Sequence, residues 1–285
     1  MASPSATRAA ITRQADLPEV CQFLHENLGR RFSAQAWRDS LLQNWATERP
    51  NFGTHLRHDG RVVGVLCAIY SDQIIDGRPE RFCNPHSWVV LEEHRHHSIG
   101  LLSQLLRQSD YHFTMFTPNP KVAQVFLGLR FRVLDDRLLF VPNLPRPAFG
   151  GVVETDSARI GGLLDGPARR DFARHAHLPW LRFAAFGRPG DMCLVVYKPS
   201  RWKKLPCATV GHISDAGAFD RHRALLHNHL LSQGFAFSRV EARFLCRTPA
   251  LAIRSHRGMP KLVLSKTLSD AQVTDLYSEL MALDL

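Results

Sequence analysis

Apolar residues in the first half of the chain switch repeatedly between the spacing of a helix and the alternation of a strand. Residues 52–70 hold two apolar runs around Asp59-Gly60, a pair that tolerates the positive φ of a tight turn, so we expect a hairpin there. After a short strand near residue 11, helices are predicted for residues 17–28, 33–47, 99–108 and 120–129, and further strands for residues 74–91, 113–117 and a closing hairpin, 131–142. The expected order is β-α-α-β-β-β-α-β-α-β-β.

A linker with three prolines and two glycines, residues 142–151, interrupts this pattern. A related order of elements follows it, with strands at residues 181–187, 193–198, 208–214, 236–244 and 261–265 and helices at residues 157–164, 219–233 and 269–283. We therefore expect an α/β (α+β) protein with two similar halves in tandem, each a mixed central sheet flanked by helices. The predicted domains span residues 1–143 and 150–285.

The bulk composition is that of a globular protein, because 45% of the 285 residues are hydrophobic and 22% are charged. A formal charge of +10 favours an anionic partner, which charge alone leaves open among a phosphorylated cofactor, nucleic acid, an acidic glycan and a membrane surface. No signal-like segment begins the sequence, and no run reaches the ~18 apolar residues of a membrane span. Six scattered cysteines without a C-x-x-C pair indicate a reduced, cytoplasmic protein.

The segment EHRHHSIGLL, residues 93–102, joins a predicted strand to a predicted helix. Such a turn exposes unpaired backbone N–H groups at the positive end of the helix dipole, and it binds phosphate where small residues allow close approach. Ser98 and Gly100 are small, while Arg95 and its neighbouring histidines add positive charge. From this segment alone, a phosphate site and a tight connection with solvated basic residues are equally consistent.

A metal site is the third interpretation of the same segment. His94 and His96 would share one side of an extended chain, and His86 could approach them. However, no cysteine or acidic residue stands at the spacing of a zinc finger or of an H-E-x-x-H helix. We therefore predict no dedicated metal site.

The spacing of these residues resembles the GNAT superfamily of acyl-CoA N-acyltransferases over roughly residues 9–141. Its signature R/Q-x-x-G-x-G/A corresponds to Arg95-His96-His97-Ser98-Ile99-Gly100, with Ser98 in place of the first glycine. About twenty residues on, Asn119 and then Leu129-Arg130-Phe131 match the asparagine and the Gly-Phe pair that the family places around its next helix. The resemblance implies a GNAT-like sheet in both halves, with the second half a degenerate copy.

The resemblance also implies the chemistry. Acyl-CoA would lie between two splayed parallel strands, with a backbone N–H of Val90 or Leu91 polarising the thioester carbonyl. The implied cofactor-binding residues are Val90, Leu91, Arg95, His96, His97, Ser98, Ile99, Gly100, Asn119 and Phe126. A base must deprotonate the acceptor, and the candidates are His86, Glu92 and Glu93. Many family members carry a tyrosine acid at the position of Phe126, which cannot donate a proton.

These observations favour an enzyme that transfers an acyl group from acyl-CoA to an amine or hydroxyl of a small-molecule or sugar-like acceptor. The acyl group expected is acetyl. The second half would shape the acceptor cleft, and the positive charge weakly favours an anionic acceptor. Phe126 supports the alternative of a non-catalytic pseudo-acyltransferase with a regulatory or assembly role. The basic stretch Arg201–Lys204 suggests nucleic acid, but no reader motif accompanies it, so we do not expect a nucleic-acid partner.

Overall fold

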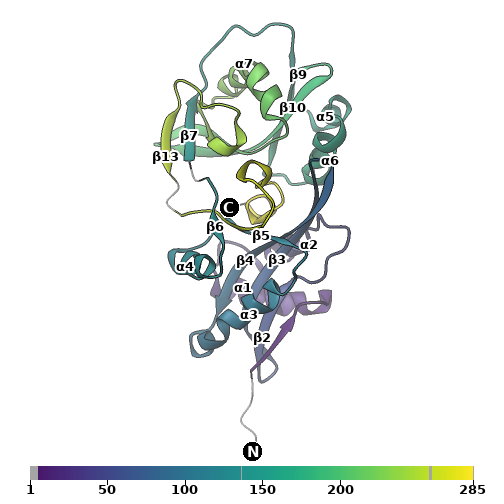
Figure 1. Ribbon diagram of the computed structural model, residues 1–285, viewed down its shortest axis with the longest axis vertical. Coiled ribbons are helices and arrows are strands. Elements are labelled where there is room, and N and C mark those ends of the chain that lie inside the picture. The colour runs from purple at the N-terminus through teal and green to yellow at the C-terminus, as the bar shows by residue number, and fades with distance from the viewer. Residues whose placement is uncertain (1–5, 136, 257–258, 285) are drawn as a thin grey trace, which may run out of the picture.

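The computed structural model describes residues 6–135, 137–256 and 259–284, which form two mixed seven-stranded sheets. Figure 1 shows them as a lower and an upper lobe, with the chain end marked C between them. The first sheet has the order β1 (Thr7–Ala10), β2 (Gly53–His58), β3 (Arg61–Ile75), β4 (Arg78–Val90), β5 (His112–Met115), β14 (Leu262–Leu264) and β6 (Arg132–Val133). The second has the order β13 (Ile253–His256), β7 (Arg137–Pro142), β12 (Phe237–Glu241), β11 (Leu205–Ile213), β10 (Asp191–Trp202), β9 (Arg182–Arg188) and β8 (Val152–Glu154).

Helices cover both faces of each sheet, because apolar stripes on the helices pack against buried strand residues. On the first sheet, α1 (Leu17–Asn27) and α2 (Ala34–Leu42) pack on one face, and α3 (Ser98–Leu106) and α4 (Pro120–Gly128) on the other. On the second, α7 (Ala216–Ser232) packs on one face, and α5 (Ser157–Leu163), α6 (Gly166–His175) and α8 (Glu279–Ala282) on the other. None of the described helices is both long and apolar enough to cross a membrane. The predicted fold class is confirmed.

The two sheets have the same arrangement of strands, and each includes one strand from the other half of the chain. Each contains one parallel pair, β4 with β5 and β11 with β12. The strand beyond that pair comes from the other half of the chain, since β14 pairs with β5 and β7 pairs with β12. The predicted hairpin at residues 131–142 is therefore wrong: its two arms, β6 and β7, lie in different sheets. The predicted division into two domains stays a prediction, and both exchanged strands cross it.

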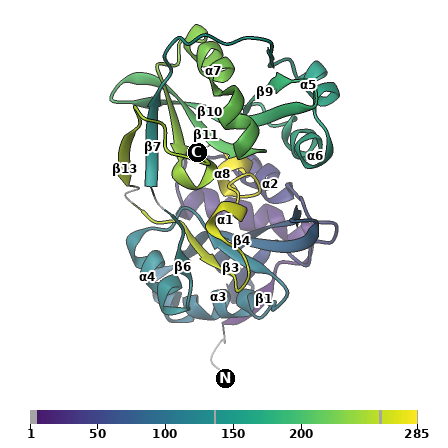
Figure 2. The ribbon, with the colours of Figure 1, turned by 45° about the horizontal axis from the view of Figure 1, so that its top comes forward.

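The C-terminal segment, residues 269–283, lies between the lobes (Figure 2), and the predicted long helix is absent from it. Described residues there form one 3-10 turn, Asp270–Gln272, and the short helix α8. The physical reason is that other elements bind its backbone carbonyls: His175 contacts the Leu276 oxygen at 3.0 Å, and Arg243 donates to the Val273 oxygen. These tertiary contacts replace the internal bonds of a helix.

Strand β4 leaves its partner β5 early. The two pair only at Phe82↔His112 and Cys83↔Phe113, although β4 continues to Val90. Near Ser87, which has a φ of 51°, a bulge in the β3–β4 pairing adds a bend to β4. The far end of β4 therefore has one edge without a neighbouring strand from the described residues, at the place where the turn into α3 begins.

Candidate active site

The open edge of β4 offers one of the two backbone N–H groups expected from the sequence. The Leu91 N–H already donates to the Val63 carbonyl of β3 at 2.9 Å, so it is not available to a ligand. Successive residues of a strand point their N–H groups to opposite edges, so the Val90 N–H faces the side from which β5 has diverged. The prediction of Val90 or Leu91 therefore narrows to Val90.

A first cavity of about 510 Å³ lies over this edge, and we call it the donor cavity. It is bounded by β4, by the turn into α3 and by α4. Its lining residues are Trp88, Val89, Val90, Arg95, Ser98, Ile99, Asn119, Lys121, Val122 and Val125. Helix α3 begins at Ser98, directly after the 3-10 turn Glu92–His97, so the positive end of its dipole lies on this side, while the Ser98 N–H itself donates to the Arg95 carbonyl. Arg95 and Lys121 are exposed cations on either side of the cavity, so the site suits a phosphorylated ligand.

Five of the ten residues expected to bind the cofactor line this cavity: Val90, Arg95, Ser98, Ile99 and Asn119. The Asn119 side chain accepts the Val122 N–H at 2.9 Å and so caps α4. Lys121 also lines this cavity but was not expected from the sequence. Its place two residues after Asn119, in the first turn of α4, was the available signal.

The other five do not line it. The Leu91 N–H bonds to β3, and His96 and His97 contact each other with tilted rings, whose centroids are 4.0 Å apart. Gly100 contacts the Arg8 guanidinium, which occupies the space where a Cβ would lie. Phe126 is fully buried between Trp88 and Phe131, so it packs beneath the site and touches neither cavity.

A second cavity of about 290 Å³ adjoins the first, and we call it the acceptor cavity. It lies where the C-terminal segment meets the first lobe, and Trp88, Asn119 and Val122 line both cavities. Most of its wall is apolar, from Leu28, Phe32, Trp37, Trp88, Met115, Val122 and Leu283. Two buried titratable side chains, His86 and Glu279, interrupt that wall.

His86 is one of the three candidate bases, and it reaches the acceptor cavity in a neutral form. Its side chain is buried, its Nδ1 lies 2.9 Å from the Ser87 hydroxyl, and burial lowers its pKa to about 3. A group with so low a pKa is a weak proton acceptor at neutral pH. Glu92 and Glu93 lie on the exposed turn before α3 and line neither cavity, and Glu92 contacts Arg95 at 3.4 Å. The structure thus separates both glutamates from the site.

Glu279 is a functional candidate that the sequence analysis missed. Its side chain is 2% exposed, and burial raises its pKa from 4.5 to about 7. The Thr117 hydroxyl donates to its Oε1 at 2.8 Å, while its Oε2 is buried without a hydrogen-bond partner among the described residues. The available signal was a glutamate within the apolar stretch Leu276–Leu283, but only the fold shows that this stretch borders the open end of β4.

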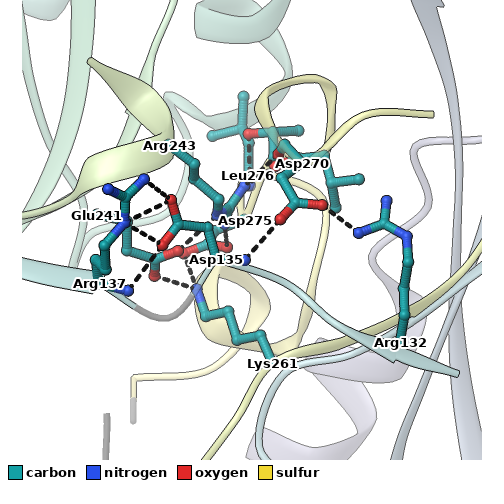
Figure 3. A network of polar contacts seen from close by, with 11 residues as sticks. Arg132, Asp135, Arg137, Glu241, Arg243, Lys261, Asp270, Asp275 and Leu276 are labelled. Atoms are coloured by element: carbon teal, nitrogen blue, oxygen red, sulfur yellow. Dashed lines mark hydrogen bonds and ion pairs between the residues drawn. The ribbon is translucent and has the colours of Figure 1, made fainter. Parts of the chain in front are cut away.

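A buried ionic network holds the C-terminal segment in place (Figure 3). Arg243 contacts Glu241 and Asp275, each at 2.7 Å, and Lys261 contacts the same two carboxylates. All four side chains are at most 4% exposed. Asp275 stands four residues before Glu279, so the network fixes the position of the segment that carries the buried carboxyl.

Comparison with known proteins agrees with this geometry at the level of fold. No protein-family model and no curated protein sequence matches the chain. The structure is similar to a GCN5-related N-acetyltransferase from Anabaena variabilis, with a TM-score of 0.62 and 10% identity over 91% of this chain and 72% of that one. A probable N-acyltransferase of unknown function from Enterococcus faecalis gives a TM-score of 0.63, with the same identity and coverage.

Eis1 from Mycobacterium abscessus is also similar, with a TM-score of 0.57 and 13% identity over 90% of this chain and 73% of that chain. These identities are low, so the similarity concerns backbone architecture. Together with the splayed β4–β5 pair and the turn into α3, the comparisons show that this chain has the fold of the GCN5-related N-acetyltransferases.

Proposed function

We propose that the protein is an acyl-CoA-dependent acyltransferase that acts on an amine or hydroxyl of a small-molecule acceptor. The observation that carries this proposal is the meeting of two cavities at Trp88, Asn119 and Val122, beside the open edge of β4. Acyl transfer needs a donor and an acceptor held in contact at a point where an oxyanion is stabilised. The two cavities supply such a point.

The donor cavity provides complementary groups for acyl-CoA. Its pyrophosphate would lie at the positive end of α3, beside the Ser98 hydroxyl and Ile99, with Arg95 and Lys121 supplying positive charge. His96 and His97 belong to the same turn without lining the cavity. Gly100 and Phe126 act indirectly, by allowing Arg8 and Trp88 to pack behind the site.

The Val90 N–H is the proposed oxyanion donor. It would hold the thioester oxygen as negative charge develops there, a role whose loss typically costs about 10²–10³-fold in kcat. The acyl group would then point toward Trp88 and Val122, two of the residues shared with the acceptor cavity.

Five buried free thiols, including Cys67 and Cys83, support a location in a reducing compartment such as the cytoplasm.

Binding of acyl-CoA is the first test of this proposal. Acetyl-CoA, hexanoyl-CoA or palmitoyl-CoA at saturating concentration should raise Tm, because a ligand that binds only the folded state stabilises it. The double variant Arg95→Ala with Lys121→Ala should lose most of that shift, whereas Arg169→Ala, which removes an exposed cation from α6, should retain it. A parent protein without a Tm shift for any of the three thioesters would contradict the proposal.

A further inference from the structure

The acceptor cavity combines an apolar wall with a carboxyl group whose position is fixed. The Thr117 hydroxyl holds Glu279 Oε1 at 2.8 Å, and the Glu279 N–H donates to Asn84 Oδ1 at 3.1 Å. Asn84 is itself held by the carbonyl and hydroxyl oxygens of Thr114, both at 3.1 Å. The two contacts of Glu279 tie α8 to the β4–β5 region, and none of the four uses Glu279 Oε2.

No hydrogen-bond donor among the described residues replaces water at Glu279 Oε2. Burying a carboxyl oxygen without a hydrogen-bond donor is unfavourable, so such an oxygen in a cavity wall is a place where a bound ligand can supply the donor. Glu279 lines the acceptor cavity, and Oε2 is buried without a partner among the described residues. Three further atoms on residues of the same cavity are also buried without a partner among the described residues: His86 Nε2 and the indole Nε1 atoms of Trp37 and Trp88.

We propose that the acceptor cavity binds a primary amine with an apolar body, and that Glu279 Oε2 accepts a proton from its ammonium group. This inference rests on the proposed acyltransferase function and assigns its substrate class. The apolar part of the amine would lie against Phe32, Trp37 and Leu283, with the nitrogen directed toward Glu279 and Trp88. An ammonium ion would supply the donor that Oε2 lacks, through a charge-assisted hydrogen bond.

The transfer moves one proton from the ammonium to Glu279 and one electron pair to the departing sulfur. Glu279 Oε2 takes one proton from the ammonium, and the freed nitrogen lone pair forms the C–N bond to the thioester carbon while the carbonyl oxygen becomes an oxyanion at Val90. Re-formation of the C=O bond breaks the C–S bond, and the sulfur leaves with that electron pair. The second nitrogen proton passes to the thiolate, and Glu279 returns its proton to water. The products are an amide, CoA thiol and one proton.

The chemistry of the base favours an amine over a hydroxyl. An alkylammonium group has a pKa of ~10, and a water-like hydroxyl has a pKa of ~16. The Glu279 carboxylate, with a pKa of about 7, is therefore far better matched to removing a proton from an ammonium than from a hydroxyl. The charged and titratable groups around Glu279 are Lys261, from the segment before β14, His86 of β4 and Arg31 of the α1–α2 connection. Lys261 is bonded to Glu241 and Asp275, and His86 is neutral, so burial dominates the pKa of Glu279.

The test measures release of CoA thiol from acetyl-CoA with three acceptors: hexylamine, 1-hexanol and glucosamine. Hexylamine should be acylated at least about 100-fold faster than the other two, and Glu279→Gln should lower that rate about 100-fold or more. The variant should keep the Tm shift with acetyl-CoA, because Glu279 lies outside the donor cavity. Glu48→Gln, which changes an exposed glutamate, should behave as the parent does.

The possible results separate the two proposals. A parent that shows no Tm shift with any thioester contradicts the acyltransferase function itself. A parent that binds acetyl-CoA but acylates glucosamine or hexanol as well as hexylamine, or none of the three, overturns the assigned substrate class. Full activity of Glu279→Gln toward hexylamine overturns the role of the carboxyl. If Glu279→Gln fails to fold, judged by its Tm, the acid limb of the parent's pH–rate profile decides: a midpoint near 7 supports the role, and no limb between about pH 5 and 8 overturns it.

Discussion

Burial shifts the pKa values of two residues of the acceptor cavity, His86 and Glu279, in opposite directions. Burial disfavours the charged form of both, which lowers the pKa of His86 to about 3 and raises that of Glu279 to about 7. Near neutral pH His86 is therefore uncharged and a weak base, whereas Glu279 can take up and release a proton. Sequence analysis placed His86 close to the reaction centre because it stands in β4, but it could not show that burial removes its basicity.

Thr117 offers a direct way to shift the pKa of Glu279. Its hydroxyl donates to Oε1 and lowers the pKa, against the larger effect of burial. Thr117→Val removes that donor, so the carboxylate becomes less stable and the pKa rises. We expect the acid limb of the kcat/KM profile with hexylamine to move up by about one pH unit. Activity should therefore fall in the parent as pH drops below about 7, and at a higher pH in the variant.

The matched control is Thr155→Val, which removes an exposed hydroxyl from the second lobe. Its profile should coincide with that of the parent. An acid limb that stays in place in Thr117→Val, or moves to lower pH, would show that Glu279 is not the group that titrates.

At the scale of elements, sequence periodicity predicted the helices and strands that are determined mainly by neighbouring residues in the chain. The turn into α3 was found because its charge, small residues and flanking periodicity are all contiguous in sequence. The C-terminal segment was misjudged because its apolar residues have helical spacing, yet His175 and Arg243 bind its carbonyl oxygens from elsewhere in the fold. Tertiary hydrogen bonds of that kind leave no periodic trace in a sequence.

The ionic network makes that segment sensitive to single substitutions. Asp275→Ala would leave the buried cations Arg243 and Lys261 without one of their two shared carboxylates. We expect a loss of about 3–5 kcal/mol in the free energy of unfolding, measured by urea denaturation, because breaking a buried ion pair leaves charge uncompensated. Asp220→Ala removes the shared partner of Arg223 and Arg247, a carboxylate that is more exposed than that of Asp275, and should cost about 1 kcal/mol or less. Equal losses in the two variants would contradict the structural role of the network.

On the scale of the whole molecule, the exchange of β7 and β14 joins the lobes into one structure. Each sheet needs a strand from the other half, and Trp45 of the first half packs on His175 and Tyr277 of the second. The sequence predicted two similar halves, but it assigned each strand to its own half because periodicity carries no information on which sheet a strand joins. An acceptor cleft shaped by the second half was expected, but most residues of the proposed acceptor cavity escaped prediction for the same reason, since its walls come from segments far apart in the sequence, such as those of His86 and Glu279.

The shared strands predict cooperative unfolding of the two lobes. Neither sheet can keep its full set of strands if the other unfolds, so calorimetry should show one transition with nearly equal calorimetric and van't Hoff enthalpies. Two separated transitions would mean that the lobes are independent folding units despite the exchange.

The placement of the donor and acceptor is tested most directly by a crystal structure of the protein with CoA. The proposed placement predicts the pyrophosphate within about 3 Å of the Ser98 hydroxyl or the Ile99 N–H, and the thiol between Val90 and the cavity that contains Glu279. CoA bound away from the open edge of β4, or with its thiol directed away from Trp88 and Val122, would contradict it.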